Sequence, residues 1–277
     1  MRRLMVLGLV LGLGAPAAWA HLTTERISYQ DGDATLEGYL ARDAHLEHPV
    51  PGILVVHEWK GLGPYAERRA DQLAQLGYVA FAVDMYGKGV RAASHEEAAK
   101  LSGAYRADRP RMRRRIRAGL EVLRQQSMVD GSRLAAIGYC FGGNTVLELA
   151  RSGADVLGVV SFHGLIDSPT PEDAKQIVGR VLVLQGADDP YVSAEQVAAF
   201  RQEMEQAGVD YQLVQYPGAV HSFTVKEAGD DPSQGVAYNA EADRDSWELM
   251  KAFLHQIFQE SDGLRAATDL GTATDFN

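Results

Sequence analysis

The residue with the clearest chemical potential is Cys140, the only cysteine among the 277 residues. It lies in the run Gly138-Tyr139-Cys140-Phe141-Gly142-Gly143, after an apolar segment at 134–137 and before a helical segment at 144–150. This is a G-x-nucleophile-x-G turn between a strand and a helix, with cysteine as the nucleophile. The N–H groups at the start of the helix favour a thiolate. The pattern predicts a reactive thiol, and an unreactive core cysteine flanked by glycines is the alternative.

A thiol nucleophile needs a base and a group that orients this base. Asp188 and Asp189 follow the apolar segment 181–184, and His221 follows the next such segment, 211–215. In a chain with this kind of turn, acid and histidine follow the nucleophile in that order. We therefore predict Cys140, Asp189 and His221 as the catalytic residues. Asp188 is the rival acid, and a helix N-cap is the alternative role of Asp189.

The loop after residues 53–56 reads His57-Glu58-Trp59-Lys60-Gly61. Attack on a carbonyl requires N–H groups that hold the developing oxyanion, and we predict those of Trp59 and Phe141. Glu58 is expected at the mouth of the cleft in contact with the thiol, where an acid suppresses ionisation. It is therefore a predicted modulator of Cys140. His163, at the end of the segment 156–161, is expected to line the same cleft.

These residues need a scaffold that brings several strand ends to one edge. Short apolar runs typical of buried strands occur at 53–56, 78–83, 134–137, 156–161 and 181–184, with a further strand at 211–215. Helical stretches occur at 66–76, 111–126, 144–150, 194–207 and 240–258. The alternation predicts one α/β domain with a mostly parallel central sheet and helices on both faces. Residues 25–42, around Asp31-Gly32-Asp33, predict an N-terminal antiparallel hairpin.

Composition excludes several classes of protein. With 46% hydrophobic and 23% charged residues the chain is close to the globular average. A formal charge of −10 argues against nucleic-acid binding, and one cysteine excludes an internal disulfide. No metal or cofactor is expected, because no His-Glu-x-x-His, cysteine pair or dinucleotide-binding glycine motif occurs. Six arginines between residues 109 and 117 are expected to form a solvated helix face.

The N-terminal residues 1–20 have the pattern of a signal peptide. Arg2 and Arg3 precede an apolar run at 4–13, and Ala18-Trp19-Ala20 provides a cleavage site. The run is shorter than the about 20 residues of a membrane span, so we expect no stable span after cleavage. The protein is predicted to be exported, periplasmic or secreted, and an uncleaved anchor is the alternative. The domain is expected at 21–260, with residues 88–108 as an excursion over the sheet edge and 261–277 as a disordered tail.

Five motifs together resemble the dienelactone hydrolase family, the cysteine branch of the α/β-hydrolase fold. They are His57-Glu58-Trp59-x-Gly61, Asp84-Met85-Tyr86-Gly87, Gly138-Tyr139-Cys140-Phe141-Gly142-Gly143, Gly186-x-x-Asp189 and His221-Ser222-Phe223. The likeness runs from about residue 25 to residue 258. It implies a Cys-His-Asp triad that hydrolyses a lactone or ester through an acyl-cysteine. It also implies that Glu58 contacts the resting thiol.

The chain departs from the family where the substrate carboxylate is bound. In that family two arginines hold this group, whereas this chain has Lys88 at the first position and Val225 at the second, with Lys226 next. A lysine is a point charge and not a bidentate fork, so a relaxed demand for a carboxylate is predicted. Tyr86 and Lys88, with His163, are the candidate substrate-binding residues.

The prediction from sequence is an exported hydrolase of small carboxylic esters or lactones that needs no cofactor. A non-catalytic ligand- or partner-binding protein with this fold is the alternative. A redox-sensing thiol is disfavoured because no second cysteine is present to resolve it. The natural substrate and the oligomeric state stay open.

Overall fold

A computed structural model describes residues 21–272 of the chain, and the side chains of residues 21–263. The expected signal peptide at 1–20 and the last residues, 273–277, lie outside the described residues. Within the described range, no helix combines the length and the hydropathy that a membrane crossing requires.

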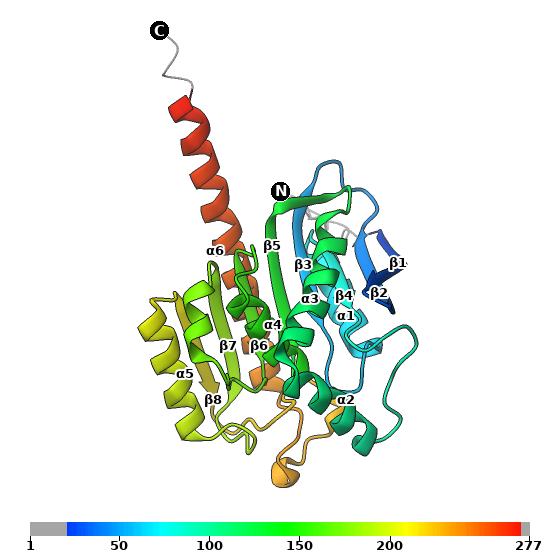
Figure 1. The fold of residues 1–277 in the computed structure, drawn as a ribbon, viewed down its shortest axis with the longest axis vertical. Coiled ribbons are helices and arrows are strands. Elements are labelled where there is room, and N and C mark those ends of the chain that lie inside the picture. The colour runs from blue at the N-terminus through cyan, green and yellow to red at the C-terminus, as the bar shows by residue number, and fades with distance from the viewer. Residues whose placement is uncertain (1–20, 273–277) are drawn as a thin grey trace, which may run out of the picture.

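The described strands form one sheet in the order β1-β2-β4-β3-β5-β6-β7-β8 (Figure 1). Their bounds are β1 Leu22–Asp31, β2 Ala34–Asp43, β3 Val50–Val56, β4 Val79–Val83, β5 Val129–Tyr139, β6 Gly158–Phe162, β7 Arg180–Gly186 and β8 Tyr211–Tyr216. The strands from β3 onward pair in parallel, whereas β2 runs antiparallel to both β1 and β4. The predicted parallel sheet with an N-terminal antiparallel hairpin is confirmed.

Helices cover both faces of this sheet (Figure 1). Their bounds are α1 Pro64–Gln75, α2 His95–Ala107, α3 Arg109–Arg124, α4 Phe141–Arg151, α5 Ala194–Ala207 and α6 Ala240–Thr272. Two apolar clusters lie between the layers, one shared with α1 and α6 and the other with α3, α4 and α5. In β3, Ile53 and Val55 enter the first cluster while Leu54 and Val56 enter the second. A strand buried on both faces reads as a continuous apolar run for this reason.

The C-terminal helix α6 is longer than the sequence indicated. It continues to Thr272, and its last turns extend beyond the sheet (Figure 1), so the prediction of a loose tail is wrong for residues 261–272. No proline interrupts this stretch. Asp262 in addition accepts a hydrogen bond from Nη1 of Arg133 at 2.9 Å.

The arginine-rich segment at the start of α3 is not the solvated face that was expected. Arg109 and Arg115 are buried. Nε of Arg115 lies 2.7 Å from Oδ2 of Asp31, and Nη2 of Arg109 lies 3.2 Å from Oδ2 of Asp167. Arg109 also donates to the side-chain oxygen of Asn144. Acidic and polar groups of neighbouring elements pair with these arginines, which is the condition for burying a charge.

Candidate active site

The turn from β5 into α4 presents Cys140. Its backbone has φ 55°, in the left-handed region that non-glycine residues rarely adopt. Two close approaches exclude side chains here: a Cβ on Gly138 would overlap the carbonyl of Gly142, and one on Gly142 would overlap that of Val56. The strained turn leaves Cys140 half-buried at the carboxyl edge of the sheet.

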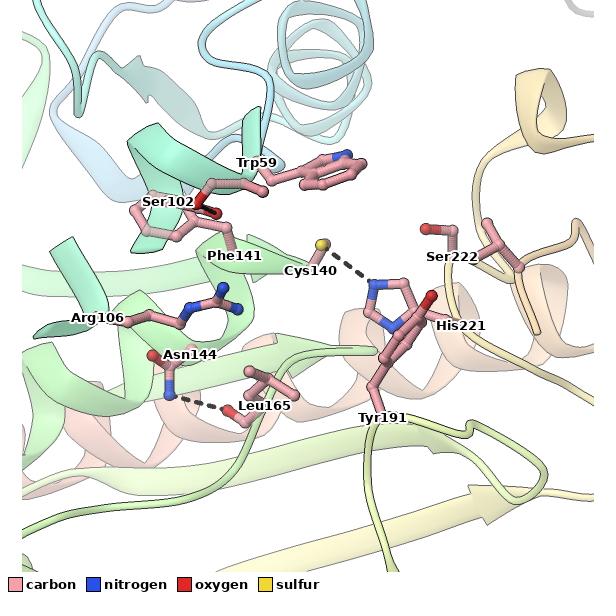
Figure 2. Close-up of a pocket in the computed structure, with 12 residues that line it drawn as sticks. Trp59, Ser102, Arg106, Cys140, Phe141, Asn144, Leu165, Tyr191, His221 and Ser222 are labelled. Carbon is pink, nitrogen blue, oxygen red and sulfur yellow. Dashed lines mark hydrogen bonds between the residues drawn. The ribbon is translucent and has the colours of Figure 1, made fainter. Parts of the chain in front are cut away.

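Cys140, His221 and Asp189 form a continuous hydrogen-bonded chain (Figure 2 shows its first contact). Nε2 of His221 lies 3.1 Å from Sγ of Cys140, and its Nδ1 lies 2.9 Å from Oδ2 of Asp189. Asp189 also accepts from the side-chain amide of Gln185 at 2.7 Å and from the backbone N–H of Tyr191 at 2.9 Å. The three residues follow β5, β8 and β7, so the parallel sheet brings together what the chain separates.

The structure decides between the alternatives that the sequence left open for Asp188 and Asp189. Asp188 accepts from the backbone N–H of Gly218 at 3.1 Å, and no hydrogen bond joins it to His221 among the described residues. The N-cap of α5 is Ser193, which forms a capping box with Gln196. Asp189 is therefore the acid that meets His221, and it does not cap a helix.

His221 is buried between two rings and two polar partners. The ring centroids of Tyr191 and His163 lie 5.0 and 5.4 Å from its own, both edge-on. Burial by itself lowers the pKa of His221, but the electrostatic interaction with Cys140 and the hydrogen bond to Asp189 outweigh it. The pKa of His221 is thus well above its usual value.

The N–H groups of Trp59 and Phe141, the predicted oxyanion donors, have no acceptor in the part of the chain that the structure describes. Phe141 is the first residue of α4, whose opening N–H groups have no partner inside the helix. Among the hydrogen bonds between described residues, none uses the N–H of Trp59 as donor. Both residues line the cavity above Cys140 (Figure 2).

Glu58 is half-buried beside this site, and its predicted contact with the thiol stays a prediction. No hydrogen bond joins its carboxyl to the Cys140 thiol in the part of the chain that the structure describes. Burial raises the pKa of Glu58 to about 7, and the charge of His221 is the main effect that opposes this rise. The carboxyl of Glu58 and the imidazole of His221 therefore interact electrostatically.

A cavity of about 260 Å³ opens over Cys140. It is lined by Trp59, Ala99, Ser102, Arg106, Cys140, Phe141, Asn144, Leu165, Tyr191, His221, Ser222 and Val236. This lining contains one guanidinium and no carboxylate. Arg106 comes from α2, the predicted excursion, and its guanidinium lies on the same wall as Asn144 (Figure 2). Within residues 21–272, no cluster of three or more His, Cys, Asp or Glu side chains is arranged to hold a metal ion.

Two of the predicted substrate contacts do not reach this cavity. Nζ of Lys88 lies 2.6 Å from Oε2 of Glu37, on the hairpin strand β2. Tyr86 is buried and donates its hydroxyl to the carbonyl of Trp59 at 2.9 Å. The structure thus places Lys88 and Tyr86 outside the cavity lining, because an acid on the hairpin pairs with the lysine and the carbonyl of Trp59 binds the tyrosine.

The third predicted contact, His163, is fully buried behind His221 and does not line the cavity. Its Nε2 lies 2.8 Å from Oγ1 of Thr224, and burial lowers its pKa well below the usual value. Sequence reasoning missed Arg106 and Asn144. A signal for Asn144 was its place one turn after the nucleophile, while nothing local distinguished Arg106 from the other arginines.

A parallel sheet with a strained nucleophile turn, and an acid and a histidine at its carboxyl edge, defines the α/β-hydrolase fold. The chain belongs to the dienelactone hydrolase family, whose model matches residues 36–258. It resembles the solved structure named m3DLH, with 39% identity, a TM-score of 0.83 and coverage of 86% of this chain and 99% of that one. Identity is also 39% to the dienelactone hydrolase-like promiscuous phosphotriesterase P91 from metagenomic libraries, with a TM-score of 0.81 and the same coverage.

A curated relative from Bradyrhizobium sp is named a probable 2-oxo-3-(5-oxofuran-2-ylidene)propanoate lactonase. It is 28% identical over 223 residues, which cover 73% of this chain and 86% of the relative. The chain is therefore a dienelactone hydrolase-like enzyme, a hydrolase of lactones or esters that acts on a small-molecule substrate.

Proposed function

We propose that this hydrolase works through an acyl-cysteine intermediate with Cys140 as nucleophile. The observation that carries the proposal is the chain from Sγ through the imidazole to Asp189, at 3.1 and 2.9 Å. The thiolate attacks the carbonyl carbon, a C–S bond forms, and the carbonyl electron pair moves onto oxygen. When the tetrahedral intermediate collapses, the C–O bond breaks and the leaving alkoxide takes the proton of the His221 imidazolium.

Water completes the cycle. His221, now neutral, accepts a proton from a water molecule whose oxygen attacks the thioester. The second tetrahedral intermediate expels the Cys140 thiolate and releases the carboxylic acid, and the imidazolium is restored. Asp189 holds the ring in the orientation that serves both steps. The N–H groups of Trp59 and Phe141 hold the oxyanion in each intermediate.

The cavity favours a small substrate with an anionic end. About 260 Å³ is below the ~300–1,000 Å³ of pockets for drug-sized ligands. Arg106 has no carboxylate partner among the described residues, whereas nearby Arg109 and Arg115 are paired. An unpaired guanidinium in a lining without acids attracts a carboxylate. We therefore propose that Arg106 fills the role that the sequence assigned to Lys88.

A second candidate activity is phosphotriester hydrolysis. The observation that favours it is the 39% identity to P91, a promiscuous phosphotriesterase, over 86% of this chain. A thiolate with two converging N–H groups has the means to attack phosphorus and stabilise charge on the phosphoryl oxygen. A neutral nitrophenyl phosphotriester tests this activity with the same variants as below.

Export is proposed on the pattern of residues 1–20 alone. Expression of the full chain in a Gram-negative host, followed by fractionation and N-terminal sequencing, tests it. A periplasmic product that begins at His21 is expected, and a membrane-bound product that retains Met1 would contradict cleavage.

The catalytic proposal is tested by measuring hydrolysis of p-nitrophenyl butyrate and a dienelactone. Wild-type turnover should be abolished by iodoacetamide, and Cys140→Ala and His221→Ala should each lose at least about 10³-fold in kcat while staying folded. Mass spectrometry of the intact protein, quenched during turnover, should show one acyl group on wild type and none on Cys140→Ala. A folded wild type without turnover would support the non-catalytic alternative. Activity in His221→Ala would refute only the triad.

A further inference from the structure

His57 lies directly behind the loop that carries Trp59 and is 1% exposed. Both of its ring nitrogens have backbone partners. Nδ1 lies 2.6 Å from the carbonyl oxygen of Glu58, and Nε2 lies 3.2 Å from the backbone nitrogen of Met85. A carbonyl can only accept and a backbone N–H can only donate, so Nδ1 carries the proton and Nε2 does not. Burial, which lowers the pKa of His57 to about 4, keeps the ring in this neutral form.

The carbonyl that His57 contacts is half of a peptide group whose other half is the Trp59 N–H. A trans peptide is planar, so its C=O and N–H point in opposite directions. Fixing the Glu58 oxygen therefore fixes the direction of the Trp59 N–H. A hydrogen bond to the oxygen also polarises the peptide and makes its N–H a stronger donor.

The surroundings of His57 connect both halves of the oxyanion hole. The imidazole stacks on the ring of Phe141 at 5.9 Å, with 21° between the planes, and meets the ring of Tyr86 edge-on at 4.9 Å. Tyr86 donates to the carbonyl of Trp59. The carbonyl of Glu58 thus accepts from His57 and the carbonyl of Trp59 accepts from Tyr86. Among the described residues, the Trp59 N–H between these two carbonyls has no acceptor.

We propose that His57 is a positioning residue of the oxyanion hole. Its Nδ1–H holds the peptide between Glu58 and Trp59 so that the Trp59 N–H faces the substrate's carbonyl oxygen. The inference rests on the proposed function, because it requires Cys140 to attack a carbonyl. His57 itself touches no reacting atom: it is absent from the cavity lining and both ring nitrogens are occupied.

Two substitutions separate the two hydrogen bonds of the ring. In His57→Asn the amide nitrogen lies near the former Nδ1 and retains a donor to Glu58. In His57→Gln the amide lies further out, near the former Nε2, so that the contact with Met85 is kept and the donor to Glu58 is lost. Removing an oxyanion donor outright costs roughly 10²–10³-fold. We expect His57→Gln to lose roughly 10–100-fold in kcat for p-nitrophenyl butyrate with KM within about twofold, and His57→Asn to recover most of the loss.

A second reaction of the same thiol distinguishes positioning from general damage. Alkylation of Cys140 by iodoacetamide displaces iodide and builds no oxyanion, and the chain has no other cysteine to react. The alkylation rate should stay within about threefold of wild type in both variants. A parallel loss of alkylation and hydrolysis, or full hydrolysis in His57→Gln, would overturn the inference.

Tyr86→Phe keeps the inference testable if His57→Gln does not fold. It is nearly isosteric and removes only the hydroxyl that holds the Trp59 carbonyl. We expect a loss of a few-fold in kcat for the ester and an unchanged alkylation rate. If His57→Gln does not fold, an unchanged kcat in Tyr86→Phe would overturn the inference. A wild type without Cys140-dependent turnover would refute the proposed function and, with it, this inference.

Discussion

The side-chain amide of Gln185 donates to Oδ2 of Asp189 at 2.7 Å, and this is the same carboxylate oxygen that meets Nδ1 of His221. Gln185 and Asp189 are both buried. Hydrogen bonds to a buried carboxylate stabilise its charged form, and that charge in turn favours the imidazolium beside Cys140. Gln185, on β7, thereby supports the catalytic pair without contacting it.

Replacing Gln185 with methionine keeps the shape of the side chain and removes the donor. A hydrogen bond to a charged group is worth about 1.5–3 kcal/mol, so we expect kcat/KM for p-nitrophenyl butyrate to fall roughly tenfold or more. Asp188→Asn is the matched control, since Asp188 directly precedes Asp189 but, within the described part of the chain, accepts its side-chain hydrogen bond from Gly218. It should retain activity within about twofold, and an equal loss in both variants would contradict the role of Gln185.

Glu58 should make stability depend on pH. Its pKa is raised to about 7 from an ordinary 4.5, so between these values the unfolded chain has released a proton that the folded protein keeps. Stability therefore falls as pH rises through this window. Between pH 4.5 and pH 7.5, the Tm of wild type should fall relative to the Tm of Glu58→Gln. Each kcal/mol of lost unfolding free energy should lower the Tm by about 2–4 °C. Glu47→Gln, a substitution at an exposed site, should show the same dependence of Tm on pH as wild type.

Substitutions of Arg106 and Lys88 test whether the enzyme recognises a negative charge on the substrate, with Lys88 as the control. Arg106→Met should raise KM roughly tenfold for an ester with a free carboxylate, such as a p-nitrophenyl hemiester, and leave KM for the neutral butyrate within about twofold. The effect should shrink at high salt. Lys88→Met should change neither value, because Lys88 is paired with Glu37 outside the cavity. Equal KM shifts for both esters would show that Arg106 does not recognise charge.

Asp31 has two arginine partners with very different burial. Arg115 is 3% exposed at its side chain and Arg114 is 60% exposed, and each has Nε within 3.0 Å of the carboxylate. Removing Arg115 leaves the buried Asp31 with only its exposed partner, and loss of a buried partner costs up to about 3–5 kcal/mol, whereas an exposed pair contributes up to about 1 kcal/mol. Urea unfolding followed by tryptophan fluorescence should separate Arg115→Ala from Arg114→Ala by that difference. Similar midpoints would refute it.

The elements and the meeting of Cys140, His221 and Asp189 could be predicted because their signals are local. Cys140, Asp189 and His221 each follow an apolar run, and parallel strands place their carboxyl ends at one edge. The substrate contacts could not be predicted in this way. The partner of Lys88 is Glu37, which lies on a strand of the predicted hairpin. A sequence pattern predicts the strand, but it does not show which distant side chain a residue of that strand contacts.

The same limit explains the errors at Arg109 and Arg115. Six arginines on one helix look like a solvated face, and only tertiary packing shows that Asp31 and Asp167 lie against them. Arg106 was missed for the related reason that α2 reaches the cavity only after it folds over the edge of the sheet. Local periodicity identifies which segment is a helix. Tertiary packing determines which of its charged side chains pair with acids and which face the cavity.

The hydrogen bonds proposed to serve catalysis span 81 residues, from Cys140 to His221, and 32 residues, from Asp189 to His221. Parallel pairing requires crossover connections and closes such long loops late in folding. During refolding, helical circular dichroism should return before ester hydrolysis does. The return of turnover therefore reports when β7 and β8, which carry Asp189 and His221 at their ends, have joined the sheet.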